Sequence, residues 1–175
     1  SNNVHFDTDS FKICVDTGAS CSMSGNVAHF EDLIPVQHQV SGISEKGLQA
    51  KGKGTLVFRI QDDNGTTSTI KLKNSLYVPG LPSPLLVPRH WSEQAGDEGT
   101  FAIFGDKSCK LFWKQRNHCK TIYYNDATKT PTFFTAPGAT TYQAFNAIFE
   151  ANDASIRNYH VLKFDRQNPL LEMML

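Results

Sequence analysis

The sequence has no excess of charge of either sign and no long hydrophobic run. Its 175 residues contain 17 Lys and Arg against 17 Asp and Glu, so the formal net charge is zero. This balance argues against a general nucleic-acid-binding domain, which carries a basic excess. No apolar stretch approaches the roughly 20 residues that span a bilayer, and the first residues, SNNVH, are not typical of a signal peptide. We expect no bound nucleic acid and no membrane association.

Cysteine is also sparse, with four residues at Cys14, Cys21, Cys109 and Cys119. The even count permits disulfides, but the density is low for a disulfide scaffold. Cys14 lies in an apolar run, where a reduced, buried thiol is expected. There is no Cys-x-x-Cys pair, and His118 beside Cys119 is an isolated pair of neighbours, so a zinc site is disfavoured. We expect neither a metal nor a cofactor.

Motifs of other hydrolases are missing as well. In many serine hydrolases a Gly-x-Ser-x-Gly segment forms the sharp turn that carries the nucleophile. The chain has no such segment, so the sequence does not support a serine or cysteine hydrolase of this kind. Hydrophobic residues make up 39% and charged residues 19%, which is ordinary for a folded soluble domain. The chain is therefore long enough and apolar enough for one domain, or for one domain with an appendage.

An acidic side chain stands where a predicted strand ends. Residues 11–15 alternate between apolar and other side chains, which indicates a half-buried strand, and Asp16-Thr17-Gly18-Ala19-Ser20 follows directly. The Thr17 hydroxyl can bond back to the backbone, and Gly18 permits conformations that other residues avoid. A carboxylate held at this place can act as an acid or a base. Because Asp, Thr and Gly are common in turns, an ordinary turn is the alternative.

The next segments predict hairpins. Residues 36–60 are rich in glycine and indicate two strands joined by a turn near Ser44–Gly47. Asn64-Gly65 is a strong signal for a tight type I′ turn between strands. Phe30, Leu33 and Ile34 have helix-like spacing, which predicts a short helical turn before Pro35.

The second half predicts one helix and three strands. Pro79, Pro82 and Pro84 exclude a continuous helix or a central strand before residue 88. Pro88 suits the first position of a helix over 88–95, and Gly96 suits its C-terminal cap. The remaining expectations, in chain order, are strands over 100–104, 109–113 and 120–124, a linker over 128–139, an amphipathic helix over 141–151 and an unassigned tail over 152–175.

Several motifs in order resemble a known family. The strand followed by Asp-Thr-Gly-Ala-Ser resembles the active-site segment of retroviral and retrotransposon aspartic proteases. The segment Lys51–Thr55, and Leu76-Tyr77-Val78-Pro79-Gly80-Leu81 with Leu85-Leu86 after it, narrow the resemblance to the copia-type (Ty1/copia) proteases. The resemblance covers about residues 11–115. It implies a mainly β, retropepsin-like fold over 1–124, a closed barrel-like half-lobe with a flap hairpin and one short helix, followed by a C-terminal extension over 125–175.

The function implied by this resemblance is an aspartic endopeptidase of a retrotransposon polyprotein. It implies Asp16 as the catalytic residue, in an intracellular enzyme of the cytoplasm or of a virus-like particle. The rest of the implied site is the active-site loop of Thr17, Gly18, Ala19 and Ser20, and a flap that contacts an extended peptide or Gag-Pol-like polyprotein substrate, made of Gly42, Ile43, Ser44, Glu45, Lys46 and Gly47.

The chain carries only one Asp-Thr-Gly motif, which is half of the expected site. A symmetric homodimer would bring two Asp16 residues together, because an isologous interface repeats the same surface. Two close carboxylates share one proton, so one can activate water while the other polarises the scissile carbonyl. The alternative is a non-catalytic dimerisation or peptide-binding module that keeps the retropepsin fold.

Overall fold

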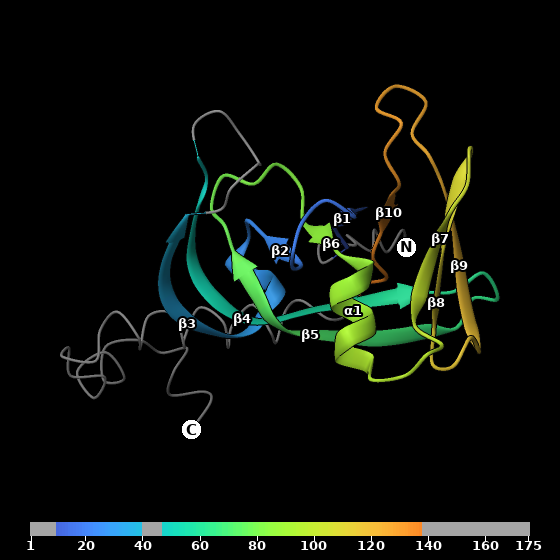
Figure 1. Cartoon of the computed structure of the whole chain (residues 1–175), viewed down its shortest axis with the longest axis horizontal. Coiled ribbons are helices and arrows are strands. Elements are labelled where there is room, and N and C mark those ends of the chain that lie inside the picture. Colours follow the sequence, from blue (N-terminus) through green and yellow to red (C-terminus); the bar gives the residue numbers. More distant parts are fainter. Residues whose placement is uncertain (1–9, 40–46, 138–175) are drawn as a thin grey trace, which may run out of the picture.

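The computed structural model describes residues 10–39 and 47–137, and these residues form a mainly β fold with one short α-helix (Figure 1). In chain order the elements are β1 (Lys12–Val15), β2 (Met23–Ser24), the 3-10 helix η1 (Val27–His29), β3 (Phe30–Gln39), β4 (Gln49–Gln61), β5 (Thr67–Tyr77), β6 (Leu85–Leu86), α1 (Pro88–Ala95), β7 (Phe101–Phe104), β8 (Ser108–Trp113), β9 (His118–Tyr123) and β10 (Thr132–Phe134).

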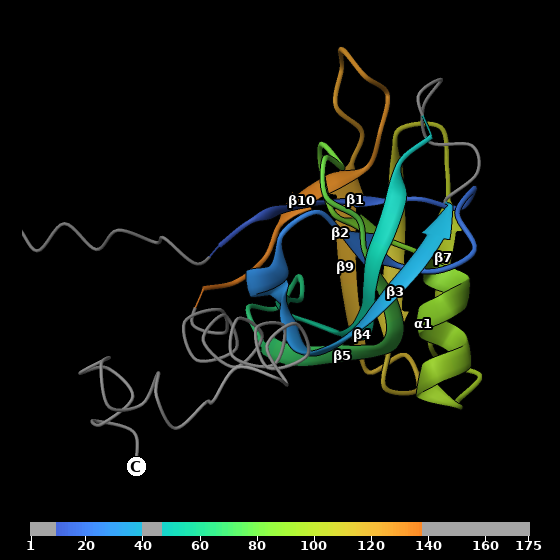
Figure 2. The same ribbon diagram turned by 90° about the vertical axis from the view of Figure 1, so that its left-hand side faces the viewer.

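The strands form two sheets. The larger sheet has seven strands in the order β10-β1-β6-β2-β5-β4-β3, and the smaller is an antiparallel sheet of β7, β8 and β9. The larger sheet is mixed, because β1 runs parallel to β6 and β2 runs parallel to β5. Figure 2 shows β3, β4 and β5 bending along their length.

The expected closed barrel is wrong for the part of the chain that the structure describes. The strand order places β10 and β3 at opposite ends of the larger sheet. One isolated bridge, Arg59 to Ala136, joins the segment after β10 to β4, and the Arg59 guanidinium donates to the Pro137 carbonyl beside it. The sheet is therefore open and strongly bent, and the segment after β10 meets β4, the neighbour of the end strand β3, at a single bridge.

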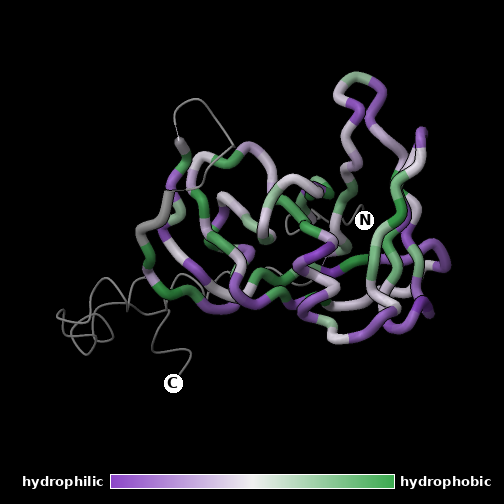
Figure 3. Tube along the Cα trace, in the orientation of Figure 1, coloured by the Kyte–Doolittle hydropathy of each residue, from purple (hydrophilic) through white to green (hydrophobic). Residues whose placement is uncertain are grey.

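The main core lies between the two sheets. Phe30 and Phe58 of the larger sheet are fully buried in one cluster with Trp113 of β8. Helix α1 lies across β5 and beside β7 (Figure 1). Its Trp91 packs on Trp113 with ring centroids 5.7 Å apart. Burying each large apolar side chain stabilises the fold by about 2 kcal/mol. Hydrophilic residues instead gather at the turns, including the one between β4 and β5 (Figure 3).

The hairpin at Asn64-Gly65 is confirmed, but its turn differs from the predicted type. β4 and β5 pair up to Gln61 and Thr67, so five residues form the connection. A type I′ turn needs positive φ at both central residues, whereas here Gly65 has φ 85° and Asn64 is not left-handed. The Asp62 carboxylate explains the difference, because its Oδ1 accepts the N–H groups of Asn64 at 3.0 Å and Thr66 at 2.7 Å.

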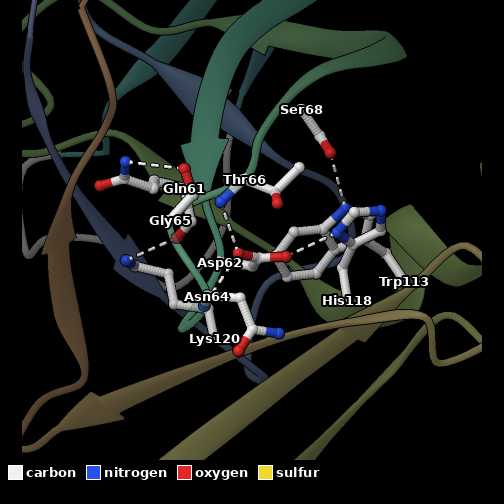
Figure 4. Close-up of polar contacts among 9 residues, drawn as sticks. All are labelled: Gln61, Asp62, Asn64, Gly65, Thr66, Ser68, Trp113, His118 and Lys120. Atoms are coloured by element: carbon white, nitrogen blue, oxygen red, sulfur yellow. Dashed lines mark hydrogen bonds and ion pairs between the residues drawn. The ribbon is translucent and has the colours of Figure 1, made fainter.

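The same carboxylate links the larger sheet to the smaller one (Figure 4). Nδ1 of His118 lies 2.7 Å from Asp62 Oδ2, and the His118 ring stacks on Trp113 at 5.3 Å between centroids. The indole N–H of Trp113 donates to Ser68 Oγ at 3.2 Å. The hydrogen bond from His118 outweighs the effect of burial and lowers the pKa of Asp62 below its ordinary value. A buried carboxylate thus holds the β4–β5 turn against β9.

The predicted helix α1 is confirmed at both ends. Pro88 is its first residue, and Gly96 caps it with φ 64° and an N–H that donates to Ser92 O. The three predicted strands of the second half are also confirmed within about two residues, as β7, β8 and β9. β3 and β4 pair antiparallel, as far as Gln39 opposite Gln49, which confirms two strands within 36–60.

Three local expectations need correction. The helical turn expected before Pro35 forms earlier, as η1 at Val27–His29, because Phe30–Ile34 begin β3, an edge strand that tolerates Pro35. β6 is a central strand despite the nearby prolines, since its two residues lie between Pro84 and Pro88 and keep their own N–H groups. Residues 128–139 are not simply a linker, since β10 pairs with β1. The helix predicted over 141–151 and the tail lie outside the described residues.

A buried histidine near β2 makes the stability of this fold depend on pH. His29 ends η1, stacks on Phe11 at 3.7 Å between ring centroids, and places Nδ1 2.7 Å from Ser24 Oγ. Burial lowers the pKa of His29 from 6.5 to about 4. The unfolded chain therefore binds a proton on this side chain below about pH 6.5, whereas the folded chain does so only near pH 4.

We expect the free energy of unfolding to fall between about pH 6.5 and pH 4, by roughly 3 kcal/mol from His29 alone. The contribution of neutral His29 to the unfolding free energy is fully present above about pH 6.5, because burial depresses the pKa of the folded state and the side chain is neutral in both states there. Urea unfolding at several pH values measures it. His29→Asn keeps a polar atom toward Ser24 but cannot titrate, so its unfolding free energy should vary less with pH. An equal pH slope in both proteins would contradict the assignment to His29.

Candidate active site at the end of strand β1

Asp16 lies directly after β1, in the interior of the larger sheet. β1 is paired on one side with β10 and on the other with β6. The Val15 N–H donates to Pro131 O at 2.9 Å, and the Asp16 N–H donates to Leu86 O at 2.9 Å. The backbone of Asp16 is therefore fixed by the sheet, while its half-buried side chain begins the loop that follows.

The Asp16 carboxylate shapes its own loop. Its Oδ1 accepts the N–H of Gly18 at 2.6 Å and of Ala19 at 3.3 Å. A Cβ on Gly18 would lie 3.3 Å from the same oxygen, so a side chain there would crowd the carboxylate. Thr17, Gly18 and Ser20 are exposed. The carboxylate is thus held through one oxygen, in a loop that is open to solvent on its other side.

Two expectations about this loop need correction. Gly18 was expected to supply an unusual backbone conformation, but its φ is not positive, and what a side chain there would do instead is crowd the Asp16 carboxylate. Thr17 was expected to bond back to the backbone, but its hydroxyl makes no hydrogen bond to the residues that the structure describes. Asp16 takes this role instead, because its Oδ1 already accepts the loop N–H groups.

The far end of the loop is anchored by Ser22, which is fully buried. Its N–H donates to Nδ1 of His90 at 3.1 Å, and its Oγ accepts the N–H of Val87 at 3.0 Å. Its carbonyl accepts the Leu76 N–H at 3.1 Å. Sequence reasoning missed Ser22 and His90. For His90, the one available signal was a polar residue next to Trp91 in the short helix, and that pattern is too common to assign a partner. Nothing comparable marked Ser22.

The cysteines beside the carboxylate are neutral thiols. Burial raises the pKa of Cys14, and the charge of Asp16 raises it further. Burial also raises the pKa of Cys21. All four cysteines of the chain are free. A thiol that stays protonated is a poor nucleophile, so Cys14 and Cys21 are weak candidates for a nucleophile at this site.

The other parts of the implied site lie elsewhere or outside the described residues. Gly42–Lys46 of the implied flap fall in the segment that the structure does not describe, while Gly47 is described and has φ 58°. The role of residues 42–47 in substrate binding stays a prediction. Within 10–39 and 47–137, no group of three or more His, Cys, Asp or Glu side chains is placed to hold a metal ion. None of the helices in these ranges is long and apolar enough to cross a membrane.

A comparison with protein-family models finds a match that includes the site. Residues 13–96 match the family model described as "Pol polyprotein, beta-barrel domain". This segment is therefore similar to the beta-barrel domain of Pol polyproteins. The match covers slightly less than half of the 175 residues. Searches of curated proteins and of solved structures found no match to the chain.

The matched segment contains the elements that hold Asp16, except β10 and the residue before it. It begins inside β1 and ends at Gly96, the cap of α1, so it includes the Asp16 loop, β6 and His90. The smaller sheet and β10 lie beyond the match. The match is to a domain of Pol and does not by itself assign a reaction, so the chemistry must be argued from the Asp16 loop.

Proposed function

We propose that this chain is an aspartic endopeptidase that cleaves peptide bonds of a retrotransposon polyprotein, with Asp16 as its catalytic carboxylate. The observation that carries the proposal is how the Asp16 carboxylate is held, with one oxygen bound to the backbone and the other free of described partners. Asp16 ends an interior strand, and its Oδ1 is fixed by two backbone N–H groups. Its Oδ2 makes no hydrogen bond to the described residues, which leaves that oxygen available to water or substrate. The Pol family match supports a substrate of the polyprotein class.

The reaction requires two carboxylates with different protonation. The ionised Asp16 takes a proton from water, and the water oxygen bonds to the scissile carbonyl carbon. The protonated carboxyl, supplied by Asp16 of the partner subunit, donates a hydrogen bond to the carbonyl oxygen and later a proton to the leaving amine. The peptide and water thus give a carboxylate and an amine, without a covalent enzyme intermediate. Two facing carboxylates favour this shared proton, because both cannot ionise cheaply.

A homodimer is proposed because this chain has one Asp-Thr-Gly motif and presents it on an open loop. Three other aspartates in the described ranges already have hydrogen-bond partners. Asp62 is bound to His118, Asp63 accepts from Thr121, and Asp97 accepts from the Gly99 N–H. The exposed Thr17–Gly18 segment lies beside Asp16, so a second copy approaching there would bring its own Asp16 to the site.

Subunit mixing tests catalysis and dimerisation together. Wild-type protein is mixed with an equal amount of Asp16→Ala protein and allowed to exchange, which is verified with differently tagged subunits. With random pairing about a quarter of the dimers keep both Asp16 residues, so peptide cleavage per wild-type chain should fall to about half.

The matched control is Asp126→Ala, which removes an exposed carboxylate from the loop after β9. Mixing wild type with this variant should leave cleavage per wild-type chain unchanged, because every dimer keeps both Asp16 residues. If Asp16→Ala mixing also leaves it unchanged, a second acid of the same chain completes the site, and Asp62, Asp63, Asp97 and Asp106 become the residues to replace. If wild type cleaves no peptide, the non-catalytic module is the better assignment.

A further inference from the structure

One short stretch of chain holds both ends of the catalytic loop. At the start of the loop, the Asp16 N–H donates to Leu86 O at 2.9 Å. At its end, Ser22 receives the Val87 N–H on Oγ and donates its own N–H to His90. Leu86, Val87 and His90 belong to β6 and the first turn of α1. The orientation of the loop relative to the sheet therefore depends on how this stretch is placed.

The hydrogen bonds of His90 define one tautomer of its ring. The backbone N–H of Ser22 can only donate, so Nδ1, 3.1 Å away, must be the unprotonated nitrogen. Nε2 lies 3.0 Å from the Lys73 carbonyl, which can only accept, so Nε2 carries the proton. The ring is 6% exposed, and burial lowers its pKa below the ordinary value. His90 is thus a neutral side chain that joins the loop to the end of β5.

We propose that His90 is a positioning residue for catalysis, which keeps the Asp16 carboxylate in its productive orientation by accepting the hydrogen bond of the Ser22 N–H. The inference rests on the proposed function. Between the two anchors, Thr17–Cys21 are exposed or half-buried and are held mainly by the Asp16 carboxylate itself. Loss of the Ser22 contact leaves a buried N–H without a partner, and the loop moves to satisfy it.

Two variants separate the Ser22 contact from the Lys73 contact. In His90→Asn, the amide oxygen lies as many bonds from the backbone as Nδ1, so it can accept from Ser22 while the contact with Lys73 is lost. In His90→Gln, the amide nitrogen takes the place of Nε2, so it can donate to Lys73 while the contact with Ser22 is lost. Each variant loses one buried hydrogen bond, so their stabilities toward urea should be similar.

The proposal predicts that kcat for peptide cleavage falls roughly 10- to 100-fold in His90→Gln, with KM changed much less, because a displacement of about 1 Å costs this much in rate. His90→Asn should keep kcat at least about tenfold above that of His90→Gln. Arg89→Gln, which breaks an exposed ion pair with Glu93 on the same helix, is the surface control and should match wild type. Equal kcat values for the two His90 variants would overturn the proposal.

Two readouts do not depend on activity. Amide exchange of Ser22 should be slow in wild type and His90→Asn and faster in His90→Gln. The nitrogen chemical shifts of His90 in wild type should show the proton on Nε2, a measurement that needs no variant to fold. A proton on Nδ1, or the same rate of Ser22 amide exchange in all three proteins, would show that the Ser22 N–H does not donate to His90, and would overturn the proposal. A wild-type chain that shows this pattern but cleaves no peptide would overturn the proposed function, and the role of His90 in catalysis with it.

Discussion

Replacing Asp16 with asparagine is expected to lower the rate of peptide hydrolysis roughly a thousandfold or more, because the site loses both the base and the shared proton. Asparagine keeps the shape of the side chain, and its Oδ1 can still accept the N–H groups of Gly18 and Ala19. The unfolding free energy should therefore change by about 1 kcal/mol or less. The rate is measured on a peptide or flanking polyprotein substrate, and the stability by urea unfolding.

Asp32→Asn is the matched control for this prediction. Asp32 lies in β3, and its carboxylate also accepts a backbone N–H, that of Thr55 at 2.7 Å, together with the Thr55 hydroxyl at 3.0 Å. The chemical change is the same, and the expected loss of stability is similar, but the cleavage rate should stay near that of wild type. Cleavage retained by Asp16→Asn would contradict the assignment of Asp16. Equal losses of rate in both variants would indicate damage to the fold instead.

The sequence was informative where a feature depends on neighbouring residues. The strand before Asp16 follows from the alternation of Phe11, Ile13 and Val15. The ends of α1 follow from Pro88, whose fixed φ suits the first turn where its missing N–H is not needed, and from Gly96, which takes the left-handed φ that other residue types avoid. The β4–β5 hairpin follows from Asn64-Gly65. Each of these signals lies within a few residues of the structure it predicts.

The predicted turn geometry was wrong where a carboxylate side chain hydrogen-bonds to the backbone of the turn. The turn at Asn64-Gly65 is not type I′, because the Asp62 carboxylate holds the N–H groups of Asn64 and Thr66. The Asp16 carboxylate similarly takes the role expected of Thr17. In both turns a carboxylate competes for the backbone donors, and its rotamer depends on the surrounding packing, so the residue pattern could not decide the turn geometry.

Contacts between residues far apart in the sequence could not be predicted from local residue patterns. Ser22 and His90 are 68 positions apart, and Asp62 and His118 are 56 apart. Either histidine, taken alone, is an unremarkable polar residue in a helix or strand. The open sheet has a similar origin, since whether seven strands close depends on how far β3–β5 bend and on where β10 pairs. These features arise from tertiary packing, which single-sequence patterns do not encode.

Replacing Gly54 with alanine is expected to be strongly destabilising for so small a change. Gly54 lies in β4, where it is opposite Leu33 of β3 and, beside a register shift, opposite Ser75 of β5. A Cβ at this position would overlap the backbone carbonyl of Asp32 and lie 2.9 Å from the Asp32 carboxylate. The carbonyl belongs to a paired strand, so it cannot move aside as the end of a flexible side chain would.

We expect Gly54→Ala to lower the unfolding free energy by at least about 3 kcal/mol, near the upper end for overpacking and for point substitutions in general. Gly105→Ala is the matched control, because its new Cβ would meet only the Ser108 carbonyl, at an ordinary 3.4 Å, and its φ is not positive. That variant should stay within about 0.5 kcal/mol of wild type. Urea unfolding of the three proteins measures the difference. Equal midpoints for the two variants would mean that β3 and β4 are not packed this closely at Asp32, and that the bulge here can widen without loss of the sheet.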